Sequence, residues 1–206
     1  MLFVWVISVA LTVLAILNAA LSEGVFGVIG VSLGGGVLYT FYAVALAIAI
    51  DALLALFIRR VLPGKWFNHK KAAFTVGAGE KNFYETIKIR KWKDKIPETG
   101  GLLVGFSKSA VADRHDNTYL LKFLKETCYA ELMHIISIPC GFLVLLLTLA
   151  WDSIPHFIAW FGLPVAIVNA VLQLLPIFVQ RYVRPFLLSA YRYNETHPRH
   201  RSLRDG

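Results

Sequence analysis

Four long apolar runs constrain what this 206-residue chain can fold into. They cover residues 2–21, 37–58, 132–150 and 157–179. A helix needs about 20 apolar residues to cross the hydrocarbon core of a bilayer. Only helices and closed barrels satisfy their own backbone hydrogen bonds inside lipid. The runs therefore predict an all-α, polytopic integral membrane protein with four transmembrane helices in a single membrane domain.

The distribution of basic residues predicts how these helices cross the membrane. All 21 Lys and Arg lie in two segments, with fifteen in residues 59–125 and six in residues 180–206. The two connections on the opposite side contain Glu23 and Asp152 but no Lys or Arg. The positive-inside rule then places both termini, the long loop and the tail in the cytosol.

The net charge of +8 fits the same interpretation. In a membrane protein, excess cations are typical of topology and of contact with anionic headgroups, and we find no nucleic-acid-binding module. Residues 82–96 of the loop interleave aromatic and isoleucine side chains with cations. That pattern favours a cytosolic segment lying on the membrane surface. Its periodicity leaves helix and strand both open.

The main candidate for chemistry is the motif Glu131-x-x-His134, where a charged segment becomes the third apolar run. Residues three apart share a face of a helix. A neutral imidazole is the usual general base near pH 7, and a nearby carboxylate can orient it. We predict His134 as the catalytic base and Glu131 as its orienting group. The alternative is a histidine that only forms a hydrogen bond between helices.

A metal site is the third interpretation of this motif. One Glu-x-x-His is half of a di-iron carboxylate site, which takes a second copy from another helix. No second copy occurs in the sequence. We therefore predict no metal ligands.

Two basic clusters are candidate substrate-binding sites. They are Arg90-Lys91-Trp92-Lys93 and Gln180-Arg181-Tyr182 with Arg184. Arginine and lysine bind phosphate, so both clusters are suited to an anionic cosubstrate. Topology, headgroup contact and the helix dipole account for the same residues without any substrate.

Asp51 lies inside the second apolar run, eight residues before Arg59 and so about 12 Å from the helix end. A carboxylate at that depth is costly unless it is paired, protonated or facing a wet cavity. Two interpretations stay open. Asp51 either joins helices by contacting a cation or His134, or it lines the substrate cavity.

The last apolar run also contains polar side chains. Three amides share one of its faces, and we expect them to contact other helices: Asn169, Gln173 and Gln180. We expect this helix to end at residues 180–185, where its arginines begin.

Three short motifs occur in order over residues 82–188. They are Ile89-Arg90-Lys91-Trp92-Lys93, then Glu126-Thr127 with Ala130-Glu131-Leu132 and His134, then Pro176 with Val179-Gln180-Arg181-Tyr182 and Arg184-Pro185. Together they resemble the glycosyl-4,4'-diaponeurosporenoate acyltransferase family, which is associated with the final acylation of a staphyloxanthin-type carotenoid glycoside. That family tends to be basic at the positions of Cys128 and Tyr129. The resemblance therefore implies the acyltransferase class and not the carotenoid acceptor.

The resemblance implies an enzyme of the bacterial cell membrane that moves an acyl chain to a hydroxyl of a lipid-linked acceptor, such as a glycolipid. The donor would be cytosolic and activated, with acyl-CoA as the expected cosubstrate and no other cofactor. The basic clusters would hold donor phosphates and stabilise the developing oxyanion. The alternatives are a metal-dependent lipid oxidoreductase, another headgroup transferase, or a non-catalytic lipid-binding scaffold. The oligomeric state is left open.

Overall fold

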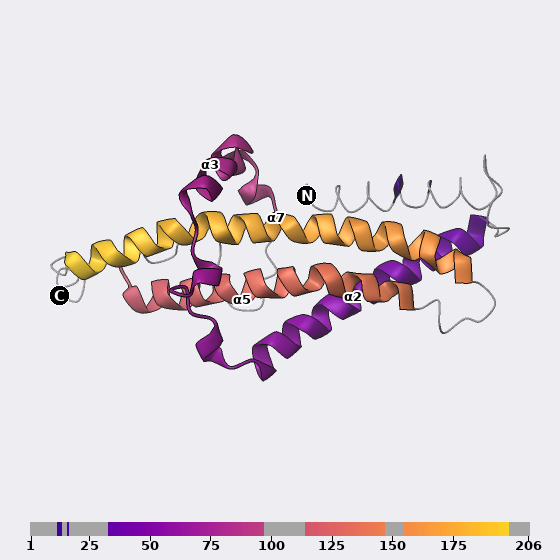
Figure 1. The fold of residues 1–206 in the computed structure, drawn as a ribbon, viewed down its shortest axis with the longest axis horizontal. Helices are drawn as coiled ribbons and strands as arrows, with labels where there is room; N and C mark the ends of the chain where they lie inside the picture. Colours follow the sequence, from indigo (N-terminus) through magenta and orange to yellow (C-terminus); the bar gives the residue numbers. More distant parts are fainter. Residues whose placement is uncertain (1–11, 14–15, 17–32, 97–113, 147–154, 198–206) are drawn as a thin grey trace. The chain divides into compact units, whose positions relative to one another are not determined.

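The computed structural model describes residues 12–13, 16, 33–96, 114–146 and 155–197 (Figure 1). The long helices are α2 (Leu33–Val61), α3 (Ala78–Thr86), α5 (Asn117–Gly141) and α7 (Pro155–Thr196). The short 3-10 helices are η1 (Gly64–Trp66), η2 (Ala72–Phe74), η3 (Ile89–Lys91), η4 (Lys93–Lys95) and η5 (Phe142–Leu146). These described ranges contain no β-strand, which confirms the all-α fold class.

Within the described residues, three helical segments are long and apolar enough to cross a membrane: Thr40–Val61, Asn117–Leu146 and Gly162–Thr196. They overlap the last three predicted spans and support a membrane protein. The predicted span 2–21 lies almost wholly outside the described residues. The count of four spans and the cytosolic placement of both termini therefore stay predictions.

The last helix is longer than its sequence suggested. The expected end at residues 180–185 is wrong, because α7 continues through Pro185 to Thr196. The arginines do not mark the end of the helix, since they pair with carboxylates in the protein. Beyond them, Leu187 packs against buried residues of α5, so the extra turns have an apolar contact of their own.

The segment 82–96 is helical and not extended. After α3 ends at Thr86, the chain passes through Lys88, whose φ of 52° is left-handed, into η3 and η4. A left-handed residue ends a helix and redirects the chain. This turn allows the short helices that follow to pack beside α3.

Contacts divide the chain into two compact units. The first comprises residues 1–60 and 133–174, and the second comprises residues 61–132 and 175–206. Both α5 and α7 contribute residues to each unit.

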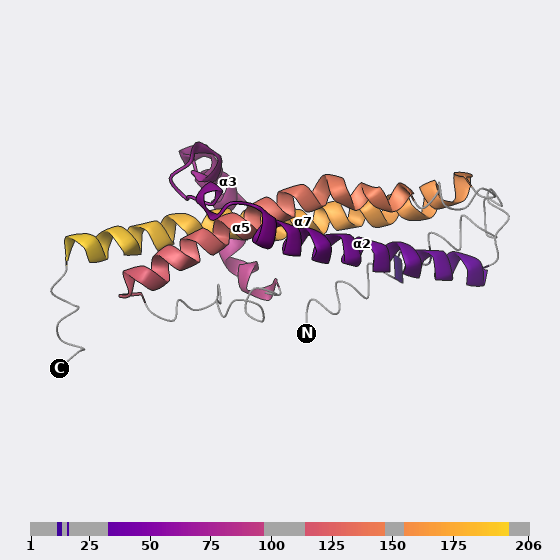
Figure 2. The ribbon, with the colours of Figure 1, turned by 90° about the horizontal axis from the view of Figure 1, so that it is seen from below.

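In the first unit, α2, the end of α5 with η5, and the start of α7 pack together (Figure 2). The core contains the small residues Ala43 and Ala47 of α2, which allow close helix contact. Gly141 and Asn169 mark a second close approach, because a Cβ on Gly141 would lie 2.6 Å from the Asn169 amide nitrogen. Many apolar side chains of α2 remain exposed, as a lipid-facing helix requires.

Among the described residues of the second unit, apolar side chains of α5, α3 and η3 pack on α7. The first turns of α5 contribute Leu120 and Leu124, which pack with Leu187. Residues of α3 and η3 contribute Tyr84 and Ile89, which pack with other residues of α7. These contacts position the loop that follows α2 on the arginine-bearing part of α7.

Candidate functional site

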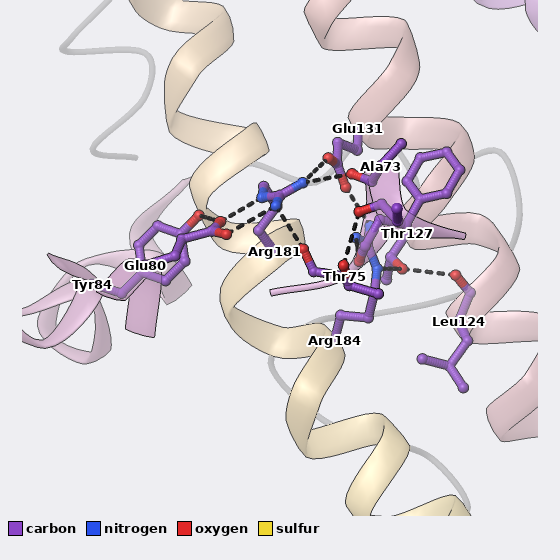
Figure 3. Close-up of polar contacts among 11 residues, drawn as sticks. Ala73, Thr75, Glu80, Tyr84, Leu124, Thr127, Glu131, Arg181 and Arg184 are labelled. Carbon is purple, nitrogen blue, oxygen red and sulfur yellow. Dashed lines mark hydrogen bonds and ion pairs between the residues drawn. The ribbon is translucent and has the colours of Figure 1, made fainter. Parts of the chain in front are cut away.

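Four charged side chains meet inside the second unit (Figure 3). They are Glu80 of α3, Glu131 of α5, and Arg181 and Arg184 of α7. Two carboxylates face two guanidinium groups, so the formal charges of the cluster cancel. We call these four residues the ion cluster.

Arg181 joins three parts of the second unit. Its Nε and Nη2 donate to both carboxylate oxygens of Glu80, with an Nη2 distance of 2.8 Å. Its Nη1 donates to Glu131 Oε1 at 2.5 Å and to the backbone oxygen of Ala73 at 3.0 Å. Nη2 also donates to the backbone oxygen of Thr75 at 2.9 Å. All five N–H groups of this guanidinium therefore have an acceptor.

Arg184 is more deeply buried and holds the other oxygen of Glu131. Its Nη2 lies 2.6 Å from Glu131 Oε2, as an ion pair without hydrogen-bond geometry. Its Nη1 donates to the backbone oxygen of Phe74 at 2.8 Å, and its carbon Cζ lies 5.4 Å from the Phe74 ring centroid. Its Nε donates to Thr127 Oγ1 at 3.0 Å. The Thr127 hydroxyl donates in turn to the Leu124 carbonyl.

The partners of Glu80 keep it ionised. Hydrogen bonds from Arg181, and then from Tyr84, hold the pKa of Glu80 below its ordinary value, although burial acts the other way. Burial and the bond to Glu80 raise the pKa of Tyr84, so its hydroxyl stays protonated and donates to the carboxylate. The backbone oxygens of residues 73–75 are held as well, so the ion cluster attaches η2 and α3 to α5 and α7.

A second polar group lies in the first unit. His134 Nδ1 of α5 lies 2.5 Å from Gln173 Oε1 of α7. The same amide donates through Nε2 to Asp51 Oδ2 of α2 at 2.6 Å, and to Asn169 Oδ1 at 3.2 Å. A hydrogen-bonded chain therefore runs from α5 through α7 to α2, within apolar helices.

A family model described as glycosyl-4,4'-diaponeurosporenoate acyltransferase matches residues 63–192, more than half of the chain. The chain belongs to this family. It is thus an acyltransferase, and its apolar helices make it a membrane protein. No curated protein matches the sequence, and no solved structure matches it. The matched residues include the whole ion cluster, His134 and Gln173, whereas Asp51 lies before them.

The two residues predicted to be catalytic have different partners in this acyltransferase. Glu131 places its two carboxylate oxygens on Arg181 and Arg184, and His134 bonds to Gln173. That Glu131 orients His134 stays a prediction. Gln173 bonds to both Asp51 and His134. This link supports the interpretation in which Asp51 joins helices.

The first predicted basic cluster has mixed surroundings. Trp92 packs beside η3 and donates from Nε1 to the backbone oxygen of Ile87 at 3.0 Å. Lys93 forms an ion pair of 2.6 Å with Asp94. Arg90 and Lys91 are exposed. A role for these cations in substrate binding stays a prediction.

Most residues of the second predicted cluster contact other residues of the protein. Arg181 and Arg184 belong to the ion cluster. Tyr182 meets the Tyr84 ring edge to face, with centroids 6.2 Å apart, and Gln180 is half-buried. That these residues bind substrate also stays a prediction.

Three residues with roles in these networks were not singled out by sequence reasoning for those roles: Glu80, Thr127 and Gln173. Glu80 is one of few acids in a strongly basic loop, and such an acid is a candidate partner for a buried arginine. Thr127 lies four residues before Glu131 and so shares its helix face. Gln173 was assigned only a helix contact, although it is the link between Asp51 and His134.

Proposed function

We propose that this acyltransferase moves an acyl chain from acyl-CoA to a hydroxyl of a membrane glycolipid. The observation that carries the proposal is the family match over residues 63–192, which includes His134 and Glu131. The family is named for acylation of a carotenoid glycoside, so a sugar hydroxyl on an apolar carrier is the acceptor class that its name suggests. The apolar helices suit an acceptor that arrives from the bilayer.

The proposed reaction is a single acyl transfer. His134 accepts the proton of the acceptor hydroxyl, and the hydroxyl oxygen attacks the thioester carbonyl. The carbon–sulfur bond breaks, an ester forms, and the thiol leaves with the proton that His134 had taken. Glu131, three residues earlier on α5, is the second catalytic candidate.

The cations of the first basic cluster are the better candidates for the donor phosphates. Arg90 and Lys91 are exposed on η3, where a soluble donor can reach them. Arg181 already donates all five N–H groups to protein acceptors, so a phosphate would have to displace Glu80 or Glu131. We therefore propose that the first cluster binds the donor, while Arg181 and Arg184 support the fold around it.

The test is acyl transfer by the purified protein in lipid vesicles. Radiolabelled acyl-CoA and a glycolipid extract are supplied, and ester formation and thiol release are measured together. The proposal predicts one thiol released for each acylated glycolipid, with both lost in His134→Ala. Thiol release without a lipid ester would contradict the proposal. Ester formation that requires a donor other than acyl-CoA would contradict it as well.

A further inference from the structure

The amide of Gln173 has a defined orientation. Its Nε2 is shared between Asp51 Oδ2 and Asn169 Oδ1, at 2.6 and 3.2 Å. The NH₂ group is the donor of this amide, and it supplies the hydrogens for both of these oxygens. Turning the amide over would place its carbonyl oxygen against two other oxygens. The carbonyl Oε1 therefore faces His134.

This orientation selects one tautomer of His134. Gln173 Oε1 is an acceptor, so the nitrogen 2.5 Å from it, His134 Nδ1, must carry the hydrogen. In a neutral imidazole only one ring nitrogen is protonated, and the other is the base. The basic nitrogen of His134 is thus Nε2.

We propose that Gln173 is the positioning residue for His134, and that Asp51 positions Gln173. Asp51 fixes the amide, the amide fixes Nδ1 as the protonated nitrogen, and Nε2 is left as the base of the acyl transfer. The inference rests on the proposed function, because it needs His134 to act as that base. It assigns Asp51 an indirect role and not contact with the substrate.

Burial makes the arrangement persistent. Gln173 is 8% exposed, and it lies on a helix face whose Asn169 packs closely against Gly141. In so dry a setting a polar group without a partner is costly, so the amide has little freedom to turn. The Gln173 amide bridges Asp51 and the His134 ring, so the carboxylate can fix the orientation of the ring without touching it. This resembles the carboxylate–histidine arrangement of hydrolase triads, in which the wrong tautomer abolishes most of the rate.

The first test measures the tautomer without any substrate. Histidine labelled with ¹⁵N in the ring is incorporated into the full-length protein in detergent, and the His134 signals are assigned by their loss in His134→Gln. When the imidazole of His134 is neutral, we expect its hydrogen on Nδ1. Gln173→Leu should convert it to the Nε2–H form or to a mixture. Asn169→Leu, which keeps Gln173 and Asp51, should leave Nδ1–H in place.

The outcome that overturns the proposal is equally direct. A wild-type protein in the Nε2–H form, or an unchanged tautomer in Gln173→Leu, would show that Gln173 does not set the ring. Because this measurement needs no activity, it is decided whether or not the acyl-CoA reaction is correct.

The second test is kinetic, and it exchanges the carboxylate of Asp51 with the amide of Gln173. Gln173→Leu should lower kcat by about 10²-fold with an unchanged donor KM, as expected for a misplaced general base. The double variant Asp51→Asn with Gln173→Glu restores a carboxylate that can accept from Nδ1–H and an amide that can hold it. We expect it to recover at least about tenfold of the lost kcat and to keep the Nδ1–H tautomer.

These results separate the inference from the function it rests on. An active Gln173→Leu beside an inactive His134→Ala would overturn the positioning role and leave the proposed function standing. An active His134→Ala would remove the proposed function, whatever tautomer is observed. A folded double variant no faster than Gln173→Leu would also count against the exchange argument.

Discussion

Glu131 and Arg184 form an ion pair of 2.6 Å in which each side chain is only 1% exposed. Removing two charges from water has a large unfavourable desolvation free energy. The ion pair offsets it only where each charge also has other polar partners. Arg181 takes the other oxygen of Glu131, and backbone oxygens of η2 take further N–H groups of both arginines. The pair therefore depends on the folded loop around it.

Removing one member of this pair should destabilise the second unit strongly. We expect Arg184→Met to cost about 3–5 kcal/mol, because it leaves Glu131 buried with half its partners. Arg192→Met removes the same charge from an exposed position of the same helix, and should change stability by no more than about 0.5 kcal/mol. Thermal unfolding of both variants in detergent measures the difference. Equal melting temperatures would show that the buried pair contributes little.

Acid should weaken the attachment of α3. The pKa of Glu80 is lowered in the folded protein by its bonds from Arg181, so its contribution to stability is complete above the ordinary glutamate pKa of about 4.3. That contribution is lost as the pH falls through the lowered pKa. The melting temperature should therefore decline below about pH 4 by more in the wild type than in Glu80→Gln. Parallel declines in the two proteins would contradict this assignment.

Neutralising the exposed cations of η3 should weaken donor binding. We expect Arg90→Gln and Lys91→Gln each to raise the donor KM with little change in kcat. High salt should reproduce the effect, because exposed charges are screened. Lys81→Gln on α3 is the matched control, since it removes an exposed charge outside the cluster. An unchanged donor KM in both cluster variants, with normal expression, would leave these cations as topology determinants.

The orientation of the chain can be tested by thiol labelling. In a background with Cys128 and Cys140 replaced by serine, the single variants Lys95→Cys and Arg192→Cys each place one thiol at an exposed position. The positive-inside rule predicts that a membrane-impermeant reagent labels both only from the cytosolic side. Labelling of either position in intact cells would contradict the predicted topology.

Apolar runs and charge were enough to predict helices and membrane insertion, and the resemblance of three short motifs indicated the acyltransferase family. They were not enough to predict where the arginines of α7 point. The sequence does not distinguish an arginine that faces water or a headgroup from one that pairs with Glu131. The fold of the loop brings Glu80 and the backbone oxygen of Ala73 in η2 to Arg181. The long-range contact between Gln173 and Asp51, 122 residues apart, was hidden for the same reason.

The turnover of His134→Ala tests most directly whether His134 is the base of the acyl transfer. The variant is purified beside the wild type, its helical content and melting temperature are compared, and ester formation from acyl-CoA is followed in vesicles. We expect kcat to fall by at least about 10²-fold in a protein that remains folded. Turnover near that of the wild type would contradict this role of His134.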